Sequence, residues 1–221
     1  MRTIRALTTA VAFVAALPSV MVAQQGRQFR DAWFWGVKGG GFTFADSAGS
    51  YTVAPAVGAE WVITRTHAGL YVGFSQAFMT TQTLFASNPA APDTSLRPIE
   101  LQNMRKVDAM LLGFPGNWLR AHPYIGIGFT LSQIADTDPA GTFNSMAELE
   151  ATQAQILNTK VGFSPVVMVG LQYRLRPISV FGQAMLSPAQ KNFILYNGRP
   201  VYGTIEVGLR YNVGSSISKD Y

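Results

Sequence analysis

The chain lacks cysteine and is poor in charge, and each shortage excludes a class of protein. Its 221 residues include no cysteine, so the disulfides that stabilise many small secreted domains are excluded. Charged residues make up 13% of the chain, although hydrophobic residues reach 48%. Soluble domains carry about 25% charged residues, so the composition argues against a water-soluble domain. The net charge of +5 is too small to indicate a nucleic-acid partner.

Long hydrophobic runs are also missing, except at the N-terminus. Two arginines precede the uncharged run Ala6–Leu17, which is too short to cross about 30 Å of hydrocarbon. This pattern predicts a signal peptide over residues 1–23 and an exported chain of residues 24–221. No later apolar stretch is long enough for a transmembrane helix.

Alternation of apolar and polar residues runs through the rest of the chain. It is uninterrupted from Thr204 to Val213 and clear from Val161 to Tyr173. Successive side chains of a strand point to opposite faces, so each such segment indicates a strand with one apolar face. The predicted strands are residues 32–44, 51–63, 68–80, 101–113, 121–134, 159–173, 178–187 and 199–213.

The connections between these strands differ in length. Three are short, Thr64–His67, Phe114–Arg120 and Arg174–Pro177, and three are longer, Thr81–Glu100, Ala135–Asn158 and Pro188–Gly198. Such asymmetry is typical of barrels in the bacterial outer membrane. We therefore predict an all-β fold, an eight-stranded antiparallel transmembrane β-barrel with short periplasmic turns, long extracellular loops and its apolar face toward lipid.

Aromatic residues agree with this orientation. All four tryptophans and two tyrosines fall at the expected periplasmic rim, where the aromatic girdle of such barrels lies. The predicted girdle consists of Trp33, Trp35, Trp61, Trp118, Tyr173 and Tyr211.

Three positions fit the predicted strands poorly. Pro165 lies inside a strand although it has no N–H for the ladder, so we expect a bulge there or a position above the membrane. Gln76 and Arg105 fall on apolar faces, and Arg105 is near the outer end, where its guanidinium could reach headgroups.

Charged residues of both signs are expected inside the barrel. These are Lys38, Glu60, Lys106, Asp108, Lys160, Glu206 and Arg210. Buried charges are tolerated when they are paired, and the first and last strands must be neighbours. We therefore predict a network of Lys38, Glu60, Glu206 and Arg210; separate, water-solvated residues remain the alternative. Side chains fill the interior of an eight-stranded barrel, so no open pore is expected.

Two stretches resemble those of a known family. The segment His122–Phe129 looks like the "PYxGxG" strand common in small outer-membrane barrels. The residues that look like the C-terminal assembly signal are Glu206, Gly208, Tyr211 and Val213. Residues 28–213 thus resemble the small outer-membrane β-barrel family that includes the OmpA transmembrane domain and OmpX. The resemblance implies handling by the outer-membrane assembly machinery, although a tail after Val213 departs from the pattern.

Catalytic and metal-binding patterns are scarce. The chain has two histidines, His67 and His122, and both are expected in periplasmic turns, away from outer-leaflet lipid. No carboxylate pair, Cys/His spacing or phosphate-binding loop stands out. We expect no enzyme, no cofactor and no metal; a lipid-modifying enzyme or a narrow channel is the least favoured alternative.

The expected outer loops are the remaining candidates for function. Ser145–Glu148 is a capping box that predicts a helix over Glu148–Leu157. Asn197-Gly198 predicts a hairpin that would continue the last two strands above the membrane. We expect a structural or surface-interaction role in contact with outer-membrane lipid. The alternative is an adhesin or a subunit of a surface assembly that binds a protein partner through the 135–158 loop or the 188–200 hairpin.

Overall fold

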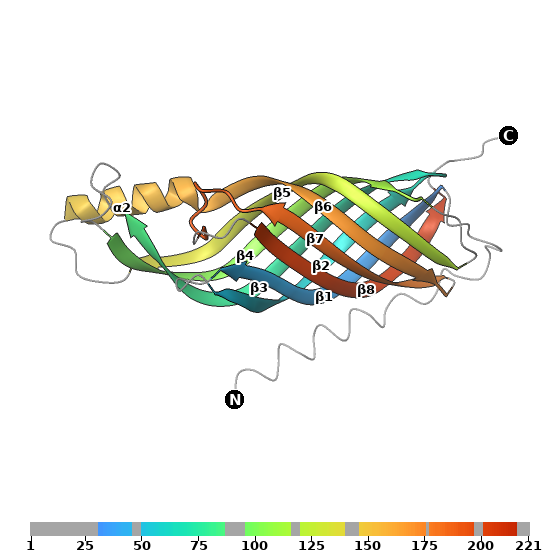
Figure 1. Ribbon diagram of the computed structural model, residues 1–221, viewed down its shortest axis with the longest axis horizontal. Helices are drawn as coiled ribbons and strands as arrows, with labels where there is room; N and C mark the ends of the chain where they lie inside the picture. The colour runs from blue at the N-terminus through green and yellow to red at the C-terminus, as the bar shows by residue number, and fades with distance from the viewer. Residues whose placement is uncertain are drawn as a thin grey trace, which may run out of the picture.

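The computed structural model describes residues 31–45, 50–86, 96–115, 120–139, 146–175, 177–196 and 201–215. These residues form eight strands and one helix (Figure 1). The strands are β1 (Ala32–Ala45), β2 (Tyr51–Thr64), β3 (Ala68–Ala86), β4 (Leu96–Gly113), β5 (Ala121–Pro139), β6 (Val161–Arg174), β7 (Ile178–Pro188) and β8 (Val201–Ser215), and the helix is α2 (Met146–Thr159). Across these ranges, no helix has the length and apolar character needed to span a membrane.

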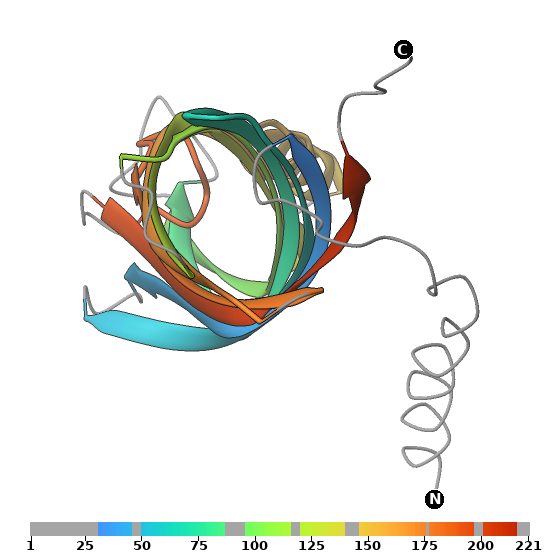
Figure 2. The ribbon, with the colours of Figure 1, turned by 90° about the vertical axis from the view of Figure 1, so that its right-hand side faces the viewer.

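The strands close into one antiparallel barrel, which confirms the predicted fold class (Figure 2). The stagger of the closed sheet is found by following paired residues around the barrel in both directions from Gly39. The route through β2, β3, β4 and β5 reaches β6 at Val161, and the route through β8 and β7 reaches β6 at Leu171. The two end points differ by ten residues. With a rise of about 3.3 Å per residue and a strand spacing of about 4.8 Å, this offset tilts the strands by about 41°.

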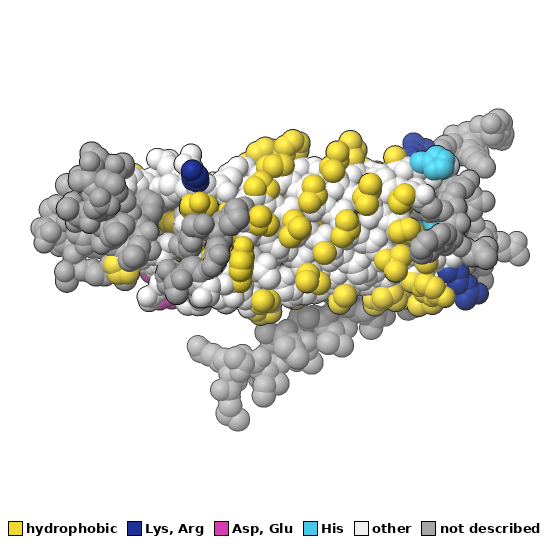
Figure 3. All heavy atoms as spheres, in the orientation of Figure 1, with side chains coloured by type: hydrophobic (Ala, Val, Ile, Leu, Met, Phe, Trp, Pro, Cys, Tyr) yellow, Lys and Arg dark blue, Asp and Glu magenta, His cyan; other side chains and the backbone are white. Residues whose placement is uncertain are grey.

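The outer wall of the barrel carries a band of exposed apolar side chains (Figure 3). Val37, Leu111 and Ile127 are 63%, 66% and 67% exposed, so the apolar face of the alternating strands points away from the barrel interior. At this tilt each residue rises about 2.5 Å along the barrel axis, and the band from Trp33 to Arg105 is about 25 Å tall. That is the height of the lipid-facing band of outer-membrane barrels.

A row of polar residues marks the outer edge of this band. Gln76, Arg105 and Gln133 are paired side by side on β3, β4 and β5. The next row toward the inner end, where β1 begins and β8 ends, presents exposed Phe74 and Val107 to lipid. The two outward polar residues that fit the strand pattern poorly therefore belong to one boundary, where a guanidinium can reach lipid headgroups.

Three strands extend further outward than predicted. β3 continues to Ala86 and β4 begins at Leu96, so both ends of the expected loop Thr81–Glu100 are strand; β5 ends at Pro139, so the expected loop Ala135–Asn158 begins as strand, and α2 forms its end. The β3–β4 register shifts between Ala77 and Thr80 and then resumes. The extension is stable because Ile99 and Leu101, both 0% exposed, pack inside it.

The predicted 188–200 hairpin is wrong over its described part. β7 ends at Pro188, and Gln190 and Phe193 begin two successive turns closed by the N–H groups of Phe193 and Tyr196. These turns bury the side chains of Phe193, Ile194 and Leu195, which are 4%, 6% and 0% exposed. Burial of three consecutive apolar residues is more favourable than their exposure on a ribbon above the membrane. Asn197 and Gly198 lie outside the described residues.

Two further expectations concern Pro165 and the loop helix. Pro165 pairs with Phe129 in an unbroken β5–β6 register, so the expected bulge is absent from this described ladder. The helix is longer than the predicted Glu148–Leu157, and Ile156 anchors it in the apolar cluster inside the outer end. Ser145, the expected cap, lies outside the described residues.

Candidate functional site

The barrel interior holds a column of six charged side chains, and glycines on neighbouring strands leave space for them. The members of the column are Lys38, Glu60, Lys106, Asp108, Glu206 and Arg210. Lys38 on β1 is paired with Gly58 on β2 and Gly208 on β8. Gly36 is paired in the same way with Glu60 and Arg210. A Cβ at Gly36 would lie 2.9 Å from Glu60 Cγ, and one at Gly58 would lie 3.0 Å from Lys38 Cε. Small residues beside each long one therefore allow charged side chains to meet across a narrow lumen.

The innermost pair joins Arg210 to Glu60. The Arg210 side chain is 1% exposed, and its Nε donates to Glu60 Oε1. Its guanidinium lies 4.0 Å from the centre of the Phe181 ring, a cation–π contact. The remaining guanidinium nitrogens donate to three neutral acceptors, Gln172 Oε1 at 2.7 Å, Gln183 Oε1 at 3.2 Å and the Tyr124 hydroxyl at 3.3 Å. Five donors in a fixed fork suit arginine to this crowded position.

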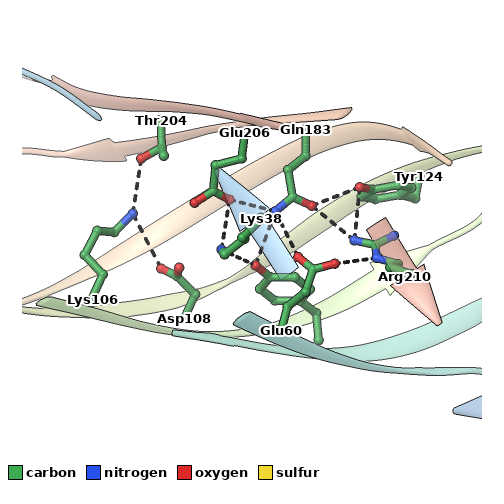
Figure 4. Close-up of polar contacts among 10 residues, drawn as sticks. Lys38, Glu60, Lys106, Asp108, Tyr124, Gln183, Thr204, Glu206 and Arg210 are labelled. Atoms are coloured by element: carbon green, nitrogen blue, oxygen red, sulfur yellow. Dashed lines mark hydrogen bonds and ion pairs between the residues drawn. The ribbon is translucent and has the colours of Figure 1, made fainter. Parts of the chain in front are cut away.

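The middle pair joins Lys38 to Glu206 (Figure 4). Lys38 Nζ lies 2.8 Å from Glu206 Oε2 and also donates to the Tyr71 hydroxyl at 2.8 Å. Gln183 Nε2 donates to Glu206 Oε2 at 2.8 Å and to Glu60 Oε2 at 3.3 Å. Gln183 therefore links the middle and inner pairs into one hydrogen-bonded network.

The outermost pair, Lys106 and Asp108, is the most loosely held. Lys106 Nζ lies 3.7 Å from Asp108 Oδ1 and donates to Thr204 Oγ1 at 3.2 Å. Asp108 is 0% exposed, and neither of its carboxylate oxygens accepts a hydrogen bond within the described residues. Lys106 therefore supplies the main electrostatic compensation for this buried carboxylate.

The structure does not bring Lys160, the remaining predicted lumen residue, to the column. Lys160 lies between α2 and β6, where its backbone N–H bonds to Ile156 and its carbonyl accepts from Ile134. Its side chain is half-buried rather than buried. The helix α2 ends at Thr159 and β6 begins only at Val161. The prediction extended the alternation of β6 back to Lys160, and it was wrong because this residue precedes the strand.

An apolar cluster fills the lumen beyond the column. Its buried members come from the outer halves of the strands, from α2 and from the segment after β7, and include Phe42, Met104, Ile156, Phe193 and Leu195. The column contains three cations and three carboxylates and therefore carries no net charge. Apolar packing and paired charges together occupy the interior, and neither arrangement resembles a solvated channel.

The aromatic residues at the inner end face outward and lie side by side. Trp35 is paired with Trp61 on one side and Tyr211 on the other. The Trp35 and Trp61 rings stack with centroids 6.2 Å apart, and Trp33 meets Trp61 edge-on at 5.5 Å. Tyr173 is 43% exposed at the same end of β6. Trp118 lies outside the described residues.

Residues of the proposed assembly signal divide between the two faces. Glu206 is buried in the lumen and Val213 is 45% exposed on the outer wall. A Cβ at Gly208 would lie 2.2 Å from the Val37 carbonyl oxygen, so the close approach of β1 and β8 requires glycine there. Packing between β1 and β8 is therefore sufficient to explain this glycine, independently of any recognition by the assembly machinery.

Sequence reasoning missed the neutral members of the network. Tyr71, Tyr124, Gln172, Gln183 and Thr204 all contact the charged residues directly. The alternation of side chains along each strand places these residues on the inner face, and this pattern could have identified them from the sequence. Among the described residues, no three His, Cys, Asp or Glu side chains form a group that could hold a metal ion.

Comparisons with known proteins bear on the fold. No protein-family model and no curated protein matches the chain. It is similar to the solved structure of Neisserial surface protein A (NspA), with 12% identity over 85% of this chain and 99% of that one, and a TM-score of 0.53. It is also similar to Ail, the attachment invasion locus protein of Yersinia pestis (10% identity, 83% and 99% coverage, TM-score 0.48), and to the outer membrane protease OmpT from Escherichia coli (9% identity, 86% and 99% coverage, TM-score 0.41). The first match shows a shared fold, that of a small outer-membrane β-barrel; the two lower scores add no argument.

Proposed function

We propose that this chain is an integral protein of the bacterial outer membrane with a structural or surface-interaction role and no open pore. The apolar band supports the location, because the outward side chains of the described strands carry no charge between the tryptophan rim and Arg105, over a height of about 25 Å, which suits lipid rather than water. The pattern of residues 1–23 supports export before insertion, which would leave residues 24–221. Outer-membrane lipid would surround the band, and the assembly machinery would recognise the last strand during biogenesis.

The filled lumen is the observation that carries this proposal. Ions crossing the barrel would have to separate the Lys38–Glu206 pair, whose side chains are 0% and 2% exposed. They would also have to pass Leu195, which is 0% exposed in the apolar cluster beyond it. Removal of one partner of a buried ion pair costs about 3–5 kcal/mol because the other charge is left uncompensated, and separating the pair to admit an ion would leave both charges uncompensated.

Conductance in planar lipid bilayers tests the absence of a pore. Purified, folded protein is expected to leave the current at the level of protein-free bilayers, with an open porin as the positive control. Stable current steps from the purified protein would contradict the proposal. Folding of the same sample is established beforehand by its migration in unboiled gels.

A second candidate, an adhesin or a subunit of a surface assembly, is favoured by the outer extension. β3, β4, β5 and α2 continue beyond the Gln76–Arg105–Gln133 row and so beyond the lipid band. On α2, Leu157 is 58% exposed while its neighbour Ile156 is buried. A single exposed leucine is common on protein surfaces, so the candidate depends on the position of α2 beyond the lipid band, and Leu157 is the side chain whose substitution tests it.

Adherence of cells expressing the chain to cultured epithelial cells tests this candidate. Leu157→Glu is expected to reduce adherence without changing the amount of protein in the membrane. His67→Ala is the matched control, because His67 is exposed in the turn between β2 and β3 at the opposite end. Equal adherence of the two variants and the unaltered protein would reject Leu157 as the contact.

The proposal includes no catalytic turnover. His67 and His122 both lie at the inner end, in the β2–β3 turn and at the start of β5, so neither reaches outer-leaflet lipid. This position supports a binding or structural role over lipid modification. Incubation of the purified protein with labelled lipopolysaccharide should leave the lipid intact, and time-dependent loss or gain of an acyl chain would reject the proposal.

A further inference from the structure

The wall of the barrel is incompletely hydrogen-bonded between β6 and β7. Their ladder runs from Arg174↔Ser179 to Val167↔Leu186 and stops there, although β6 continues outward to Val161. On its other side, β6 remains paired with β5 over the same stretch, as far as Val161. We call the region bounded by residues 161–166 and 187–193 the seam.

Two prolines account for the end of this ladder. Extension of the register by two residues would set Pro165 opposite Pro188, and neither proline has an N–H to donate. Extension by two more would set Phe163 opposite Gln190, and there the Phe163 N–H donates to the side-chain Oε1 of Gln190 at 3.1 Å. A side-chain amide thus replaces the backbone ladder across the seam.

The backbone contact resumes beyond the seam. The Ile194 N–H donates to the carbonyl oxygen of Thr159 at 2.9 Å, again in the extended register. Between Val167 and Thr159 the Gln190 side chain therefore provides the hydrogen bond that joins the two sides. Figure 1 shows the arrow of β7 ending short of the outer end of β5, with the chain continuing as a coil.

The inner part of the seam, around Pro165 and Pro188, faces the hydrocarbon of the outer leaflet, and its outer part, with exposed Lys191 and Asn192, reaches the headgroup level. Pro165 lies eight residues from the girdle residue Tyr173 on β6, which at the observed tilt places it about 20 Å above the inner rim of a band about 25 Å tall. The outward side chains around it are apolar and exposed, with Phe163, Val167 and Leu186 at 54%, 53% and 55%. No water is available at the depth of Pro165 to compensate unpaired backbone groups, so lipid chains are the molecules in contact with the inner part of the seam.

Behind the seam lies the apolar cluster and not the charged column. A Cβ at Gly162 would lie 2.9 Å from the Phe193 ring, so this ring packs directly against the inner face of the seam. Phe193 in turn contacts Tyr202, with ring centroids 6.3 Å apart, and both belong to the cluster. One coiled segment therefore separates an apolar interior from the surrounding lipid.

We propose that the seam is a binding site for one acyl chain of an outer-leaflet membrane lipid. The chain enters between β6 and β7, displaces Phe193 and packs against the apolar cluster. The apolar character of both the surrounding lipid and the apolar cluster supports an acyl chain as the ligand. An alkyl chain that moves from one to the other stays in apolar surroundings. The opening breaks the bond between Phe163 and Gln190 and leaves every strand ladder intact.

Engineered disulfides test the proposal, because the natural chain has no cysteine to interfere. Val166 and Ser187 are buried, lumen-facing residues that the extended register sets opposite each other, so V166C/S187C locks the seam. The control lock is T130C/S164C, a directly paired, buried position in the intact β5–β6 ladder. Both variants are refolded into phosphatidylcholine vesicles that contain phosphatidylcholine with a photoreactive group midway along one acyl chain.

Cross-linked residues are then mapped by mass spectrometry. The unaltered protein and the oxidised control lock are expected to show cross-links to Phe193 and its buried neighbours, and the oxidised V166C/S187C protein is expected to lose them. Cross-links confined to outward residues such as Phe163 in the unaltered protein would overturn the proposal, as would interior cross-links that persist in the locked seam. Interior labelling by a photoreactive free fatty acid but not by the phospholipid would overturn the assignment to a membrane lipid.

A second variant keeps the proposal testable if the locked protein does not fold. Gln190→Ala removes the bond to the Phe163 N–H and is expected to increase interior cross-links relative to the unaltered protein. Gln133→Ala, at an outward position of the intact β5–β6 ladder, is the matched control and should leave them unchanged. Unchanged or reduced labelling in Gln190→Ala would show that the seam is not the entry point.

Discussion

Removal of one member of the Lys38–Glu206 pair should destabilise the barrel far more than removal of both. The two side chains are 0% and 2% exposed, with Nζ and Oε2 2.8 Å apart. Glu206→Leu leaves a buried ammonium hydrogen-bonded to the neutral Tyr71 hydroxyl. Breaking a buried pair in this way costs about 3–5 kcal/mol of unfolding free energy.

The double variant K38M/E206L removes both charges and leaves the neighbouring groups satisfied. Gln183 Nε2 retains its contacts to Glu60 Oε2 and to the Tyr71 hydroxyl, each at 3.3 Å. Replacement of a buried pair by apolar residues of similar volume is neutral or stabilising by about 1–4 kcal/mol. The coupling free energy from the four-protein cycle is therefore expected to reach about 3 kcal/mol.

Equilibrium urea unfolding in detergent micelles, followed by tryptophan fluorescence, measures all four proteins. Refolded protein is used so that an effect on cellular assembly, which Glu206 would also influence as part of the proposed signal, does not enter. Single variants that each cost less than about 1 kcal/mol and that combine additively would refute the reasoning. Lys38 and Glu206 would then be separately solvated residues of a wet lumen.

The close strand contacts, the apolar cluster and the aromatic rim give further tests. Gly40→Ala should lower the unfolding free energy by about 1–3 kcal/mol, because its Cβ would lie 1.9 Å from the Ile205 carbonyl oxygen. Gly39→Ala, whose Cβ would meet its nearest atom at 3.7 Å, should change it by less than about 0.5 kcal/mol, and equal effects would contradict the assigned close approach. Leu195→Ala should cost about 2–5 kcal/mol in the same assay and leave bilayer conductance at background, because the ion pairs lie in a separate layer; a new conductance would show that the cluster alone closes the lumen. Lipids brominated near the headgroup should quench tryptophan fluorescence more than lipids brominated at the chain ends, and the reverse order would place the rim at mid-bilayer.

The strands in contact with lipid could be predicted from the sequence because lipid enforces a simple pattern. Every outward position in the band must be apolar, so alternation is strict and the inner ends of the strands agree closely with the structure. Beyond Ala77 this constraint ends, and Thr80–Thr83 is polar on both faces. The register also shifts there, opposite Asn103 with its left-handed φ of 55°, and alternation carries no trace of such a shift.

The sequence predicted which charged residues lie in the column, but it predicted only part of the contacts between them. The alternation along each strand assigned Lys38, Glu60, Glu206 and Arg210 to the interior. Which of these side chains contact one another depends on the ten-residue stagger of the strands around the barrel. That offset is a property of the closed sheet and has no local signature. The run Phe193–Leu195 did carry a signal, since three consecutive apolar residues indicate burial rather than an alternating ribbon.

The closed membrane barrel is tested most directly by gel migration of the purified protein before and after boiling. A closed barrel keeps its fold in unboiled SDS samples, so the unboiled protein is expected to migrate differently from the boiled protein and to be found in the membrane fraction. Identical migration of the two samples, together with recovery of the protein in the soluble fraction, would contradict the barrel and the membrane location together.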